Sequence, residues 1–91
     1  MRLRARVRRA TRKTRHYYGH IDRDHVVKDT ELPTPAYVEI EPSGDGAFYL
    51  FYFDAKGVCM TDTWHESVER AKAQAEFEFE ITEQDWEDVA P

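Results

Sequence analysis

The sequence predicts an α+β fold in which a β-meander of three antiparallel strands is followed by one amphipathic helix, behind a basic N-terminal arm. Two short segments rich in glycine and aspartate separate three apolar runs. An apolar stripe at helical spacing comes after these runs, and most of the arginines come before them. We therefore expect a flexible arm over residues 1–30 and a βββα domain over residues 31–91.

The charge of the chain is divided along its length. Its net charge is -5, yet residues 1–30 carry ten Lys/Arg against three Asp, whereas residues 31–91 carry three Lys/Arg against fifteen Asp/Glu. Such asymmetry is typical of a tail that binds nucleic acid or another acidic surface. It is equally compatible with an arm that lies on its own acidic body. The composition leaves both interpretations open.

The basic arm is the candidate site for nucleic acid. Its cationic residues include Arg4, Arg6, Arg8, Arg9, Arg12, Lys13 and Arg15. Because few apolar residues lie among them, we expect residues 1–15 to lack stable structure when nothing is bound. Residues 16–30 have a mixed pattern, which predicts irregular structure or one short strand near residues 24–28. Two prolines in residues 32–35 mark the boundary of the domain.

Three apolar runs predict the strands of the sheet. They cover residues 37–41, 47–54 and 58–62. Asp45-Gly46 is a strong signal for a two-residue hairpin turn, and such a turn would place Ile40 opposite Phe51. The side chains that this register turns toward the helix are Val38, Ile40, Tyr49, Phe51, Phe53, Val58 and Met60.

The reverse face of the sheet is the predicted partner-binding surface, because a single helix covers one face only. The residues expected to bind a partner there are Tyr37, Glu39, Glu41, Phe48, Leu50 and Tyr52. A mixed aromatic and acidic surface suits a basic protein partner. A second copy of the chain, or residues 16–32 folding over the patch, are the alternatives.

A capping box predicts where the helix begins. Thr63 followed by Glu66 is the expected pair of N-cap and third helical residue, so the helix should start at residue 64. The stripe expected to pack on the sheet consists of Trp64, Val68, Ala71, Ala75 and Phe79.

The sequence gives little support for catalysis or for a bound metal. The good transition-metal ligands are His16, His20, His25, His65 and Cys59, and they form no second paired cluster of the kind that zinc sites use. The predicted position of Cys59 in mid-strand indicates a structural thiol. Phosphate-binding glycine loops and serine elbows are missing from the sequence. We therefore expect no enzyme activity, no catalytic residue, no metal and no cofactor.

The chain has one cysteine and no N-terminal apolar run of the signal-peptide type. We therefore expect a cytoplasmic protein without a disulfide and without contact to a membrane.

Acidic, glycine and aromatic residues follow a recognisable spacing in residues 37–80. They are Glu41-x3-Asp45-Gly46-x-Phe48, then Asp54-x2-Gly57, then Asp62-Thr63-x2-Glu66, and Ala71. In these positions the chain resembles the HicB-like antitoxin family. The resemblance implies a βββα core similar to part of the ribonuclease H fold, without its catalytic carboxylates. It also implies a partner, a small toxin that cleaves messenger RNA.

These observations predict a small non-catalytic protein-interaction module that binds a basic partner, and the resemblance implies that it is a HicB-like antitoxin or inhibitor. The alternative is an accessory nucleic-acid-binding protein that acts through the arginine-rich arm.

Overall fold

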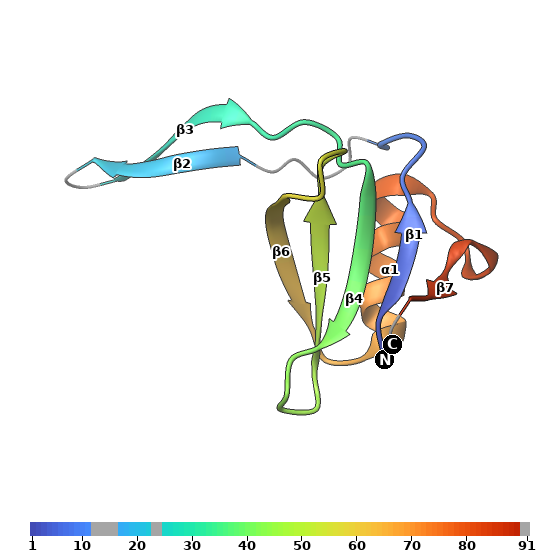
Figure 1. The fold of residues 1–91 in the computed structure, drawn as a ribbon. Helices are drawn as coiled ribbons and strands as arrows, with labels where there is room; N and C mark the ends of the chain where they lie inside the picture. Colours follow the sequence, from blue (N-terminus) through green and yellow to red (C-terminus); the bar gives the residue numbers. More distant parts are fainter. Residues whose placement is uncertain (12–16, 23–24, 90–91) are drawn as a thin grey trace.

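The computed structural model describes residues 1–11, 17–22 and 25–89. A five-stranded antiparallel sheet carries one α-helix on one face, and a two-stranded hairpin lies apart from it (Figure 1). The sheet has the strand order β6-β5-β4-β1-β7. Its strands are β1 (Leu3–Arg6), β4 (Tyr37–Pro42), β5 (Phe48–Phe53), β6 (Cys59–His65) and β7 (Glu87–Asp88). The predicted α+β class is confirmed, but the sheet has five strands where three were expected.

The N-terminal segment differs most from the expectation. β1 pairs with β4 on one side and with β7 on the other. Ala5 is 1% exposed, and Leu3 and Val7 pack against the core. The prediction that residues 1–15 lack stable structure is therefore wrong for β1. Apolar residues alternate with arginines in this segment, so one face of the strand is buried while the arginines point the other way.

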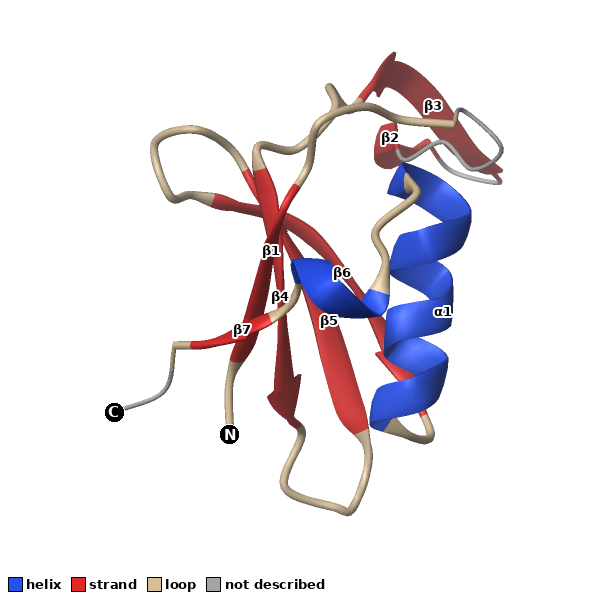
Figure 2. Ribbon diagram, turned by 90° about the vertical axis from the view of Figure 1, so that its right-hand side faces the viewer, coloured by secondary structure: helices blue, strands red, loops and turns tan. Residues whose placement is uncertain are grey.

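The hairpin consists of β2 (Tyr17–Asp22) and β3 (His25–Glu31), which pair with each other in antiparallel fashion. Irregular structure, or one short strand near residues 24–28, was expected in this part of the chain. Figure 1 shows the hairpin projecting beyond one end of the sheet, and Figure 2 shows it on the helix side. β2 and β3 therefore do not lie over the face of the sheet that is opposite the helix.

The register between β4 and β5 is one residue away from the predicted one. Ile40 pairs with Leu50, not with Phe51. The amide of Ser43 donates to the carbonyl of Ala47 at 2.9 Å, so the loop between them holds three residues and not two. Gly44 and Gly46 have φ of 93° and 89° in this loop, a conformation that favours glycine. A shift of one residue moves every side chain of β5 to the other face.

The core lies between α1 (Val68–Phe79) and the sheet. Its buried residues are Ala5, Val38, Ile40, Leu50, Tyr52, Ala71, Ala75, Phe79 and Ile81. The prediction for Val38 and Ile40 is confirmed. The prediction for β5 is wrong, because Leu50 and Tyr52 lie beneath the helix and Phe51 and Phe53 lie on the opposite face.

The helix begins later than the capping box predicted. β6 continues through Thr63 and Trp64, and the N-cap of α1 is Ser67, whose hydroxyl accepts from the amide of Arg70 at 3.2 Å. Trp64 is therefore not part of the helix stripe and is 52% exposed. The alanines and the phenylalanine of that stripe are buried against the sheet as predicted.

The C-terminal segment returns to the sheet after α1. A short 3₁₀ helix, η1 (Glu83–Asp85), precedes β7, which pairs with β1. Residues 87–89 consequently lie beside residues 2–4, and the amide of Val89 donates to the carbonyl of Arg2 at 2.8 Å. Ile81 and Trp86 pack against the core from this segment.

Candidate functional site

The candidate site is the face of the sheet opposite α1, which we call the open face. Figure 2 shows the helix on one side of the sheet and no described element on the other. The strand registers place on the open face Arg4, Arg6, Tyr37, Glu39, Glu41, Tyr49, Phe51, Phe53, Asp62 and Trp64.

Aromatic rings form a continuous strip on the open face. Tyr37 stacks on Phe53 with ring centroids 5.0 Å apart, and Phe51 lies 6.3 Å from Phe53 and 5.4 Å from Tyr49. Trp64 pairs with Tyr49 in the register of β5 and β6 and extends the strip to the edge of the sheet. Partly exposed aromatic residues of this kind supply most of the binding energy in many protein interfaces.

An arginine already occupies one end of this strip. The Nε of Arg4 donates to Oε2 of Glu39 at 2.7 Å, and the guanidinium lies 4.8 Å from the centre of the Tyr37 ring. The hydrogen bond to Glu39 is the main reason why the pKa of Arg4 rises above its usual value. Nε of Arg2 lies 3.6 Å from the other carboxylate oxygen of Glu39. Glu39 as a residue is only 4% exposed. The carboxylate is therefore neutralised from two sides.

Two further carboxylates lie beside the middle and the far part of the strip. Glu41 pairs with Tyr49 across β4 and β5, and Asp62 pairs with Phe51 across β5 and β6. Within the described residues neither carboxylate forms an ion pair. These positions of the open face therefore combine negative charge without an ion-pair partner among the described residues with partly exposed aromatic surface.

The predicted partner-binding residues divide between the two faces. Tyr37, Glu39 and Glu41 lie on the open face, as expected. The prediction is wrong for Leu50 and Tyr52, because both are fully buried under α1. It is also wrong for Phe48, which packs against the same core. Residues that the sequence interpretation assigned to the core or to the helix lie on the open face instead: Tyr49, Phe51, Phe53 and Trp64. Every position of β5 is aromatic or apolar, so alternation alone could not identify them.

The predicted nucleic-acid-binding residues are also divided. Arg4 and Arg6 belong to β1, and Arg8 follows that strand. Arg9 forms an ion pair with Glu80 at 2.5 Å. Arg12, Lys13 and Arg15 lie outside the described residues. Two of these predicted residues, Arg4 and Arg9, therefore lie against carboxylates of the chain's own acidic part.

A polar cluster is buried beneath the helix. Glu78 is 2% exposed and accepts hydrogen bonds from the hydroxyl of Tyr52 and from Nε2 of Gln74, the latter at 2.9 Å. Thr63 Oγ1 lies 2.7 Å from Nε2 of His65 and 3.4 Å from the Tyr52 hydroxyl. Burial raises the pKa of Tyr52 and lowers that of His65. These hydrogen bonds give the buried carboxylate of Glu78 the donors that it needs, and this structural role explains the cluster.

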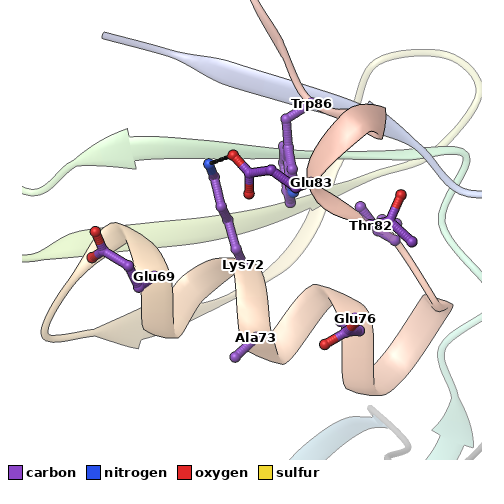
Figure 3. Close-up of a pocket in the computed structure, with 8 residues that line it drawn as sticks. Glu69, Lys72, Ala73, Glu76, Thr82, Glu83 and Trp86 are labelled. Atoms are coloured by element: carbon purple, nitrogen blue, oxygen red, sulfur yellow. Dashed lines mark hydrogen bonds and ion pairs between the residues drawn. The ribbon is translucent and has the colours of Figure 1, made fainter.

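A groove of about 380 Å³ lies between α1 and η1 (Figure 3). The carboxylates of Glu69 and Glu76 lie along it, and Nζ of Lys72 forms an ion pair with Glu83 at 2.7 Å. In the described part of the chain, no group of three or more His, Cys, Asp or Glu residues is placed to hold a metal ion. Cys59 is a free, exposed thiol whose pKa is raised, chiefly by desolvation. The groove and the thiol therefore suggest no particular chemistry.

The chain matches no family model, no curated protein and no solved structure. Among the described residues no helix has the length and apolar character needed to cross a membrane. The function must therefore be inferred from the chain's own surface, of which the open face is the most distinctive part.

Proposed function

We propose that this protein is a small non-catalytic interaction module whose open face binds a basic protein partner. The observation that carries this proposal is the aromatic strip with Glu41 and Asp62 beside it, which no described helix covers. Apolar contact with the rings would supply affinity, and the carboxylates would attract a basic partner and disfavour acidic competitors.

An antitoxin or inhibitor of the HicB-like kind is the more specific form of this proposal. Its support is the order of elements, because β4, β5 and β6 are consecutive antiparallel strands followed by α1. The motif itself contributes less support. Asp62 and Thr63, which the resemblance places at a helix start, lie within β6.

Nucleic acid is the competing ligand for this surface, since aromatic rings stack on bases and arginines contact phosphates. Three arginines of the N-terminal segment form ion pairs, Arg2 and Arg4 with Glu39 and Arg9 with Glu80. Glu41 and Asp62 would repel phosphate beside Tyr49 and Phe51. The charges on the open face therefore favour a partner rich in lysine and arginine.

The test is a titration of the full chain, followed by amide chemical shifts, with three probes. These are a basic peptide and an acidic peptide of about ten residues each, and a single-stranded RNA of about ten nucleotides. We expect the basic peptide to shift the amides of β5 and β6. Asp62→Lys should weaken this binding by about tenfold. The matched control is Glu76→Lys, an equal charge change on the outer side of α1, and it should leave the affinity within about twofold.

Equal losses in the two variants would mean that the basic peptide responds to overall charge and not to the open face. Shifts caused by the RNA with none caused by the basic peptide would support the nucleic-acid alternative.

A further inference from the structure

The two edges of the five-stranded sheet differ in whether a short strand covers them. At one edge β7 covers β1, and Val89 extends this pairing by donating its amide to the carbonyl of Arg2 at 2.8 Å. At the other edge, among the described strands, β6 pairs with β5 alone. In an antiparallel ladder alternate residues direct their N–H and C=O groups away from the paired neighbour. β6 therefore presents a row of backbone donors and acceptors that no described strand uses.

The free edge has few of the features that normally prevent strand pairing. Edge strands are usually protected by lysine, by proline, by shortness or by bulges. β6 has seven residues and contains neither lysine nor proline. Its single irregularity lies opposite the junction of Tyr52 and Phe53, so residues 61–65 pair regularly with β5. Asp62 is the one acidic residue of the strand, and its side chain lies on the open face.

We infer that β6 accepts an extended basic segment of the partner as an additional antiparallel or parallel strand. This inference rests on the proposed function and specifies how the partner binds. A strand beside β6 would place alternate side chains next to Asp62 and Trp64, with Cβ atoms of opposed residues about 4.5–5.5 Å apart. Lysine or arginine at those positions would pair with the carboxylate and lie against the indole. The segment is therefore one with basic residues at every second position.

β1 provides an example of this arrangement within the same chain. It is a strand of alternating basic and apolar residues that lies along the opposite edge of the β4–β5–β6 meander. Arg4 pairs in register with Glu39 and lies over the ring of Tyr37, while Ala5 turns toward the core. A basic strand along β6 would find the same combination of carboxylate and ring in Asp62 and Trp64.

A second copy of the chain is the less favourable occupant of this edge. Pairing of β6 with β6 would bring the acidic parts of two copies together. In each copy residues 31–91 carry three Lys/Arg against fifteen Asp/Glu. Like charges at this density oppose association unless an opposite charge separates them. A foreign basic segment benefits from the charge that disfavours self-pairing.

The experiment uses peptides of about nine residues and the full chain. The first peptide alternates arginine with apolar residues, and the second has the same composition with its arginines consecutive. Two further versions of the first are N-methylated at alternate amides, one at each parity. We expect the alternating peptide to bind about tenfold more tightly than the permuted one. One methylation parity should weaken binding by about tenfold and the other by less than about twofold, because alternate amides face β6.

The protein variants Asp62→Asn and Glu76→Gln provide the matched comparison, since both remove one exposed carboxylate. Asp62→Asn should lower the affinity for the alternating peptide several-fold, whereas Glu76→Gln should leave this affinity unchanged. If the two N-methylated peptides bound with equally reduced affinity, or if neither lost affinity, strand addition would be overturned. If a basic peptide then still shifted the open-face amides, the proposed function would stand without this binding mode. A parent protein that is dimeric and loses its dimer on addition of the alternating peptide would overturn the foreign partner in favour of a second copy.

Discussion

At the scale of single residues, Leu50 and Phe51 define which side of β5 is the core. Leu50 is 0% exposed beneath α1, whereas Phe51 lies on the open face between Tyr49 and Phe53. Truncating a fully buried side chain leaves a cavity that its surroundings fill incompletely. Truncating a ring on an open face leaves space that water can occupy.

We therefore expect Leu50→Ala to lower the free energy of unfolding by about 2–5 kcal/mol. Phe51→Ala should lower it by roughly 1 kcal/mol, mainly through lost contact with the neighbouring rings. Urea denaturation of both variants at neutral pH measures these values. A larger loss for Phe51→Ala than for Leu50→Ala would show that the other register of β5 is the correct one.

Tyr52 is a second residue with a measurable effect, because its hydroxyl donates to the buried carboxylate of Glu78. Desolvation and this hydrogen bond raise the pKa of Tyr52 in the folded protein. Folding therefore favours the protonated phenol of Tyr52. The stability that this preference contributes is fully present below the pKa of an unfolded tyrosine, about 10, and it is lost as the pH rises from there through the higher pKa of the folded state.

Tyr52→Phe should accordingly cost about 1–3 kcal/mol at neutral pH, since Glu78 loses a donor. It should also reduce the fall in stability above about pH 10 relative to the parent. Denaturation midpoints measured from neutral to alkaline pH check both effects. A variant whose alkaline slope equals that of the parent would assign the titration to other groups.

At the scale of elements, the end of β6 and the start of α1 compete for the same residues. The local capping pattern favours a helix from residue 64, but Trp64 and His65 pair with Tyr49 and Phe48 of β5. Pairing with β5 supplies hydrogen bonds and cross-strand contacts that a first helical turn at this point would lack. Ser67 then caps the helix, which begins where pairing with β5 has ended.

This assignment predicts that Ser67→Ala lowers stability by about 1 kcal/mol, because the amide of Arg70 loses its acceptor. Glu66→Ala should change stability by less than about 0.5 kcal/mol, since Glu66 is an exposed residue outside the helix. Thermal unfolding followed by circular dichroism compares the two. The reverse ranking would restore the capping box at Thr63.

At the scale of the whole molecule, β1 joins the two ends of the chain. It lies between β4 and β7, so the N-terminal and C-terminal segments belong to one sheet. Ion pairs from Arg4 to Glu39 and from Arg9 to Glu80 connect the basic start of the chain to its acidic part. These ion pairs balance part of the charge asymmetry inside the fold.

Deletion of residues 1–8 should therefore remove cooperative unfolding, because it exposes the buried side of β4 and leaves Glu39 without its two arginines. The control is Arg6→Gln combined with Arg8→Gln, which lowers the positive charge but keeps β1. Calorimetry or circular dichroism distinguishes the two. A deletion variant that melts like the parent would show that the segment is a dispensable arm.

The amino-acid sequence by itself determined the α+β class, the order of β4, β5, β6 and α1, and the small residues Ala71 and Ala75 that allow the helix to approach the sheet. These features depend on turn residues and on periodicity over a few neighbouring positions. The tertiary structure decided which face of β5 is buried, because all six of its residues are aromatic or apolar. It also decided that Leu3–Arg6 is a strand, because the pairing of Leu3 with Ile40 joins segments far apart in the chain. Local patterns specify that an element forms, whereas long-range pairing selects its partner and its buried side.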